Sequence, residues 1–153
     1  MTAISFTIFG EPASKANSRE IVTRKRRMDD GTTKVVPVSI KSGKALNYEK
    51  EALRQIPPKA RLRLEGPVRV RLRIFYANEL SDLDESIVLD VLQDRFEKVD
   101  HPNGGPKRHL VQAGVYRNDR QVREKHVFHG IDKLMPRTEI EVEPLQAQQE
   151  TLL

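Results

Sequence analysis

The chain has no cysteine and no tryptophan among its 153 residues, and aromatic side chains make up only 5% of it. Without cysteine it can form neither disulfides nor thiolate metal sites, and it has no cysteine nucleophile. No apolar run is long enough to cross a bilayer, and the N-terminus lacks the pattern of a signal peptide. These absences fit a reducing compartment and predict that the protein does not bind a membrane.

Positive and negative charges are separated along the chain, whose formal net charge is +5. Residues 14–44 contain nine Lys or Arg and three Asp or Glu, whereas residues 79–100 contain eight acidic and two basic side chains. The basic segment could attract a polyanion that the acidic segment would repel unless cations intervened. A metal-dependent enzyme acting on nucleic acid would need this separation, and a solvated basic loop beside a solvated acidic helix would also produce it.

Hydrophobic periodicity predicts one small α+β domain over residues 1–145, with a mixed, mostly antiparallel sheet and two main helices. Alternating, β-branched segments predict strands at 4–9, 21–27, 35–40, 68–76, 121–128 and 138–143. Amphipathic patterns predict helices at 42–56, where Pro57-Pro58 ends the first, and at 84–96. We expect a loop at 97–113 and a disordered tail at 146–153.

Candidate DNA-binding residues lie in a polar loop after the first strand, at the tip of the hairpin predicted within 21–40, and after Gly104-Gly105. They are Lys15, Asn17, Arg19, Arg24, Lys25, Arg26, Arg27, Lys107 and Arg108. Plain loops, or a mobile basic arm that orders only on a ligand, are the alternatives. The strand at 68–76 also places Arg69, Arg71 and Arg73 on one face, where they could bind phosphate or face water.

Two aspartates one residue apart, Asp82 and Asp84, open the second predicted helix. Acids in a first turn cap the free N–H groups and suit the helix dipole, so capping alone accounts for Asp82, Asp84 and Glu85. Capping does not account for Asp119, which opens a strand in a second loop. Carboxylates from the two loops could converge on Mg²⁺, which takes oxygen ligands, as metal-assisted phosphodiester hydrolysis requires.

The order of these segments resembles the RusA-type family of Holliday-junction resolvases, which phages and prophages carry widely. The resemblance rests on Asp82-Leu83-Asp84 at the start of a helix and on Asn118-Asp119-x-Gln121-Val122 at the start of a strand. The Pro- and Asn-containing basic loop at 10–17, and Ser42, Ala45 and Tyr48 at the first helix, add to it. No single motif is diagnostic, and the resemblance spans roughly residues 4–142.

The resemblance implies a small domain that forms a tight, intertwined homodimer. It also implies an endonuclease that depends on Mg²⁺, with Mn²⁺ as a substitute, and that nicks branched DNA symmetrically in recombination or repair. Asp82, Asp84 and Asp119 would then be the catalytic, metal-binding residues. Such an enzyme would act in the cytoplasm of a bacterial or phage-infected cell.

The chain departs from the family's pattern beside the two aspartates. Glu85 stands where the family usually has asparagine, and it could supply a further metal ligand. Val88 occupies the position of a functional lysine, so Lys15, Lys107 or Arg108 would have to provide that cation from a loop. The 97–113 connection is also longer than usual. The alternative function is therefore a weakened or inactive relative that binds branched DNA, and a third is an interaction domain whose acids only cap a helix.

Other sites are not expected. The four histidines lack metal-ligand spacing and there is no cysteine, which argues against a zinc site. Gly104-Gly105 with Lys107 lacks the Gly-Lys-Ser/Thr ending of a P-loop, so we expect no nucleotide cofactor.

Overall fold

The computed structural model describes residues 3–102 and 104–145, and strand β4 (Val68–Tyr76) lies at its centre. Every second residue of β4, beginning with Val68, is 0% exposed. β4 pairs with antiparallel β8 (Arg137–Pro144) and parallel β7 (Val122–Ile131), and β8 pairs with antiparallel β1 (Ile4–Phe9). The order β1-β8-β4-β7 confirms the mixed, mostly antiparallel sheet.

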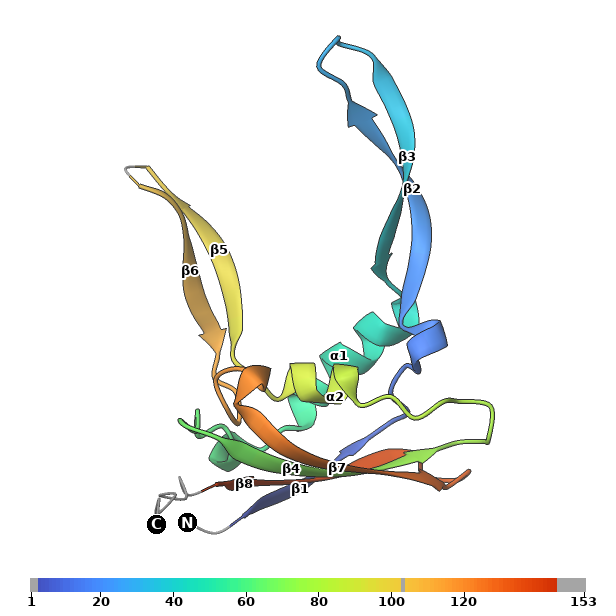
Figure 1. The fold of residues 1–153 in the computed structure, drawn as a ribbon, viewed down its shortest axis with the longest axis vertical. Helices are drawn as coiled ribbons and strands as arrows, with labels where there is room; N and C mark the ends of the chain where they lie inside the picture. The colour runs from blue at the N-terminus through green and yellow to red at the C-terminus, as the bar shows by residue number, and fades with distance from the viewer. Residues whose placement is uncertain (1–2, 103, 146–153) are drawn as a thin grey trace, which may run out of the picture.

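Two α-helices, α1 (Gly43–Gln55) and α2 (Ser86–Val91), lie on one side of this sheet (Figure 1). Helix α1 begins where the Ser42 hydroxyl accepts a hydrogen bond from Ala45 N at 3.1 Å, and it ends just before Pro57. Its buried side chains pack with α2 and the inner residues of the sheet in one core. No helix in the described part of the chain is long and apolar enough to span a membrane.

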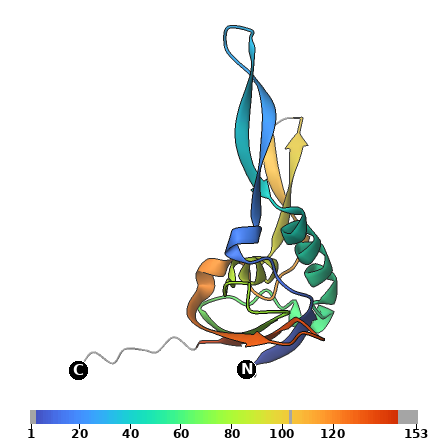
Figure 2. The same cartoon turned by 90° about the vertical axis from the view of Figure 1, so that its right-hand side faces the viewer.

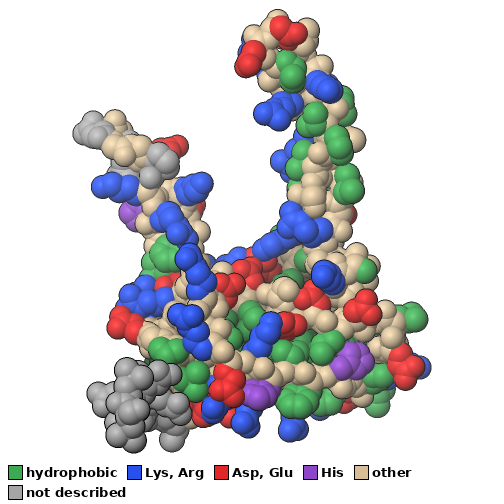
Figure 3. Space-filling model, in the orientation of Figure 1, with side chains coloured by type: hydrophobic (Ala, Val, Ile, Leu, Met, Phe, Trp, Pro, Cys, Tyr) green, Lys and Arg blue, Asp and Glu red, His purple; other side chains and the backbone are tan. Residues whose placement is uncertain are grey.

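Two β-hairpins rise from the side of the sheet that carries the helices (Figure 2). Strands β2 (Arg19–Arg27) and β3 (Thr33–Lys41) form the first, which confirms the predicted basic hairpin. Strands β5 (Arg95–His101) and β6 (Gly105–Gln112) form the second. The space-filling view shows an open gap between them (Figure 3).

The second hairpin corrects two predictions. Residues 97–113 are not a loop, because 97–101 belong to β5 and 105–112 to β6. The helix expected at 84–96 is only six residues long. The helix ends at Val91, and the buried carboxylate of Asp94, just before β5, accepts hydrogen bonds from Gly114 N at 2.8 Å and from Arg63, joining the two ends of the hairpin. The predicted tail at 146–153 lies outside the described residues.

Candidate active site and nucleic-acid interface

The segment between β4 and α2 holds Asp82 and Asp84. Asp84 N donates to the Tyr76 hydroxyl at 3.1 Å, and Asp84 Oδ1 accepts from Ser86 N at 3.0 Å and Ser86 Oγ at 2.7 Å. Asp84 therefore holds the start of α2. Asp82 is exposed, and its carboxylate has neither a hydrogen bond nor an ion pair with any described residue.

A second acidic position, Asp119, lies beyond the other end of α2. It opens the short 3₁₀ helix η3 (Asp119–Gln121), which Asn118 caps through a hydrogen bond from Arg120 N at 2.9 Å. Asp119 N donates to Gln93 Oε1 at 3.1 Å, and Gln93 Nε2 donates to Asp90 Oδ1 at 2.8 Å. Through Gln93, the end of α2 thus holds the backbone of Asp119 in place.

Two buried tyrosines, one near each end of α2, have a pKa that burial and nearby negative charge raise. Burial raises the pKa of Tyr76, and the charges of Asp84, Glu11 and Glu85 raise it further. Burial likewise raises the pKa of Tyr116, and the charges of Asp119 and Asp90 add to the effect. Each end of the helix is therefore a separate electronegative centre.

The length of α2 separates these centres. Six helical residues at 1.5 Å each give α2 a length of about 9 Å; the Asp82–Asp84 loop precedes it, and Asp119 contacts Gln93, which follows it. Within residues 3–102 and 104–145, no group of three or more His, Asp or Glu lies close enough together to hold a metal ion. One loop brings together two of the three predicted metal ligands, and the third lies at the other end of the helix.

Ion pairing distinguishes the acids around α2 from one another. Among the five acids of residues 81–94, Glu85 pairs with Lys125 at 2.6 Å, Asp90 with Lys41 at 3.5 Å and Asp94 with Arg63 at 2.9 Å. Asp82 and Asp84, and Asp119 beyond the helix, have no cation within ion-pair distance among the described residues. Glu79, in the same segment as Asp82, likewise has no ion pair with a described residue, so the three acids that the sequence singles out share this property with it.

Lys125 was missed by the sequence reasoning. It lies opposite Val70 in the β4–β7 register, and so on the helix-covered side of the sheet, but β7 is an edge strand and Lys125 reaches out to Glu85. Only the strand pairing reveals this contact. It engages the Glu85 carboxylate, which was expected as a possible further metal ligand.

The predicted DNA-binding cations lie mostly on the hairpins, where Lys and Arg side chains are prominent in the space-filling view (Figure 3). Arg24 to Arg27 are exposed on β2, Lys107 and Arg108 lie on β6, and none of these forms an ion pair with a described residue. Lys15 and Asn17 lie in the 3₁₀ helix η1 (Lys15–Asn17), and Arg19 at the root of β2 donates to Ser39. Phosphate could therefore reach cations on both hairpins.

One buried carboxylate joins the roots of the two hairpins. Glu49 of α1 accepts from Lys41 Nζ, at the end of β3, at 2.7 Å, and it also pairs with Arg95 at the start of β5. The Glu49 side chain is only 10% exposed. Burial acts to raise the pKa of Glu49, but the two cations outweigh it, and the pKa lies below its usual value.

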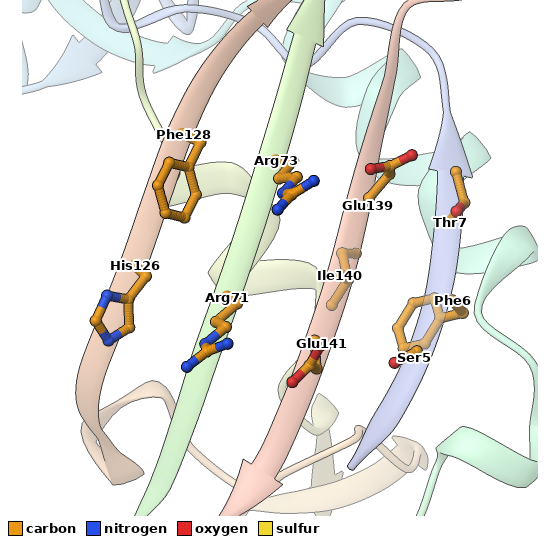
Figure 4. Close-up of a pocket in the computed structure, with 10 residues that line it drawn as sticks. All are labelled: Ser5, Phe6, Thr7, Arg71, Arg73, His126, Phe128, Glu139, Ile140 and Glu141. Atoms are coloured by element: carbon orange, nitrogen blue, oxygen red, sulfur yellow. The ribbon is translucent and has the colours of Figure 1, made fainter.

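Arg71 and Arg73 of β4 face the other side of the sheet, away from the helices and hairpins (Figure 4), and Arg69 shares their alternation along the strand. Arg69 pairs with Glu124 of β7 and Glu143 of β8, and the register places Arg71 beside Glu141 and Arg73 beside Glu139. Glutamates of β8 lie beside the arginines, so the charge of this face is mixed and not uniformly basic.

Comparison with protein-family models finds no matching family, and comparison with curated proteins finds no match.

Proposed function

We propose that the protein is a Mg²⁺-dependent endonuclease that cuts branched DNA such as Holliday junctions, with Mn²⁺ able to substitute. The observation that carries the proposal is the arrangement around α2. Asp82, Asp84 and Asp119 have no ion pair with a described residue, and the two hairpins with their unpaired cations rise on the same side of the sheet as α2. The basic hairpins could bind the phosphate backbone of DNA, and the carboxylates could coordinate a metal ion.

The donor set suits Mg²⁺. This ion usually keeps several waters and takes one or two protein carboxylates together with substrate phosphates, so a three-carboxylate cage is not required. Asp82 and Asp84, one residue apart, would hold it, and Asp119 would lie further along the groove of bound DNA. A bound Mg²⁺ would polarise the scissile phosphate and supply a water of lowered pKa.

The hairpins provide the binding energy in this proposal. Backbone contacts by Lys and Arg position nucleic acid without reading its sequence, and they make binding salt-dependent. A branched substrate presents several backbones at once, so two separated basic hairpins can be engaged together by one junction. In a homodimer, two such sites would face two opposed strands.

A synthetic four-way junction with labelled strands tests the proposal. We expect cleavage with Mg²⁺ or Mn²⁺, and little cleavage of a linear duplex of the same sequence. The double variant Asp82→Asn/Asp84→Asn should cut more than about 100-fold more slowly, since even outer-shell changes at metal sites cost 10–100-fold. Its junction affinity should not fall, because the change removes negative charge.

The matched control is Glu139→Gln/Glu141→Gln, which removes two carboxylates with the same spacing from the far face of the sheet. This control should cut like the unaltered protein. Full cleavage by the Asp82→Asn/Asp84→Asn protein would refute the metal assignment.

A second candidate function is branched-DNA binding without cleavage. The observation that favours it is Val88, which is 0% exposed in the core where the resemblance has a functional lysine. This function predicts salt-sensitive junction binding and no cutting, and turnover with either metal excludes it. A purely capping role for the acids fits Asp84 alone, since Asn118 caps η3 and Asp82 caps nothing among the described residues.

A further inference from the structure

The β5–β6 hairpin exposes a phenylalanine with a guanidinium over its ring. Arg108 Cζ lies 4.4 Å from the ring centroid of Phe96. Phe96 is opposite Leu110 in the register, and Lys98 is opposite Arg108. Because side chains alternate along a strand, these four residues share one face of the hairpin. That face combines an aromatic ring, an aliphatic side chain and two cations.

Apart from the Arg108 guanidinium, no residue of the described core packs over the apolar part of this face. Phe96 and Leu110 are both 41% exposed, and neither belongs to the core cluster of the sheet and helices. A two-stranded hairpin is marginally stable in water on its own, and a partner that covered these side chains would add to the apolar surface that it buries. Phe96 is also the second residue of β5, beside the root of the hairpin and close in sequence to the end of α2.

The charge on this face indicates the kind of partner. Lys98 and Arg108 form no ion pair with any described residue, and Glu97 belongs to the opposite face, where its register partner is His109. Asp100, nearer the tip, is the one acid among residues 95–112 that shares the alternation of Lys98. The cations outnumber the acids beside an open aromatic ring, which suits an anionic ligand that also carries flat, apolar groups.

We propose that this face binds unpaired bases of single-stranded DNA, with a base stacked on the Phe96–Arg108 pair and flanking phosphates held by Lys98 and Arg108. Base stacking on an aromatic ring beside backbone-tracking cations is how proteins hold single strands, and arginine adds a cation–π contribution. Fully paired DNA offers no free base face, so the site would select strands opened at a branch. The inference rests on the nucleic-acid binding in the proposed function, but not on cleavage.

Replacement of Phe96 by tryptophan gives a direct probe, because the chain has no tryptophan of its own. The Phe96→Trp protein keeps a stacking ring, and its emission should be quenched when a single-stranded oligothymidylate is added in EDTA. The matched control is Phe128→Trp. Phe128 is 53% exposed and has Arg73 Cζ 5.9 Å from its ring centroid, but it lies on the far face of the sheet. Emission of the control should not change.

A second variant measures the contribution of stacking. Phe96→Ala should weaken single-strand binding roughly 5- to 150-fold, as expected for the loss of one stacked base, and should change duplex binding less than about 2-fold. Circular dichroism checks that the fold is retained. Fluorescence anisotropy establishes saturation independently of the quenching.

The inference is overturned if Phe96→Trp emission stays constant at saturation, or if Phe128→Trp is quenched equally. An absence of single-strand binding also overturns it, whether or not junctions are cut. Because these titrations contain no metal, a failure to cleave junctions leaves their result intact. Cleavage without quenching would preserve the nuclease and remove the stacking site.

Discussion

Replacing Glu49 with glutamine tests whether one buried carboxylate holds the two hairpins at their roots. Glutamine keeps the size of the side chain and one acceptor oxygen but removes the charge that Lys41 and Arg95 share. Both cations would then lie near each other without their common anion. We expect lower stability and faster amide hydrogen exchange in both hairpins.

The size of the loss follows from exposure. A hydrogen bond to a charged group contributes about 1.5–3 kcal/mol, and Glu49 accepts two. The Lys41 and Arg95 side chains are 39% and 29% exposed and can be rehydrated, and Lys41 keeps Asp90 at 3.5 Å. We therefore expect a loss of about 2 kcal/mol in the free energy of unfolding, below the 3–5 kcal/mol of a fully buried pair. For a chain of this length, that lowers Tm by about 6 °C.

The effect should depend on pH with a definite sign. The pKa of Glu49 is lower in the folded protein than in the unfolded chain, so its ion pairs stabilise the fold at neutral pH. That contribution begins to be lost below the unfolded value of about 4.3 and disappears as the pH falls through the folded pKa. The difference between Glu49→Gln and the unaltered protein should therefore shrink below about pH 4.

Urea and thermal unfolding followed by circular dichroism at pH 7 and pH 3.5 measure both effects. Glu51→Gln is the control on the same helix, because Glu51 is 57% exposed and pairs with Arg54 at 3.4 Å. An exposed pair of this kind contributes less than about 1 kcal/mol. The reasoning is refuted if Glu49→Gln loses no more stability than Glu51→Gln, or if its deficit is the same at both pH values.

Two further changes test the site and the fold around it. Lys125→Met should slow junction cleavage roughly 5- to 30-fold at low salt, because it leaves the Glu85 charge uncompensated near the substrate phosphate. The double variant Glu85→Gln/Lys125→Met should restore the cleavage rate. A double variant that cuts as slowly as Lys125→Met would contradict this explanation. Gly114→Ala should lower the free energy of unfolding by about 3 kcal/mol in urea titrations, because its Cβ would lie 2.3 Å from Gln93 C and 2.5 Å from Asp94 N. Gly104→Ala, whose Cβ would meet nothing within 4 Å, should be nearly neutral.

Local patterns predicted most of the sheet and the first helix. The alternation of β4 appears directly in its burial, and Ser42 and Pro57 bound α1 as capping rules require. The second helix is shorter than the sequence predicts, for a physical reason. Phe96 continues the apolar stripe of Val88 and Leu92, so periodicity cannot show that α2 ends at Val91 and that Asp94 accepts a hydrogen bond from Gly114 N.

The second hairpin had a usable signal that was overlooked. Gly104 and Gly105 lie between Val99 and the Leu110-Val111 pair, as turn residues do between two strands. The placement of Asp119 could not be predicted in the same way. Its distance from Asp84 depends on the length of α2 and on Gln93 holding its backbone, and both are consequences of tertiary structure.

In the folded protein, Lys125 pairs with Glu85, the residue that replaces the asparagine usual in the RusA-type family. The resemblance has a neutral asparagine after the second aspartate, whereas this chain adds a negative charge there. Lys125, on a different strand, forms an ion pair with that carboxylate at 2.6 Å and offsets part of its charge. The missing lysine at Val88 is not compensated in this way, because Val88 is buried in the core and supplies no cation to the site. If the site cuts DNA, the metal and cations from the hairpins must therefore stabilise the negative charge on the scissile phosphate. The cleavage rate should accordingly depend more steeply on metal concentration and on salt concentration than the rate of an enzyme whose site contains a lysine.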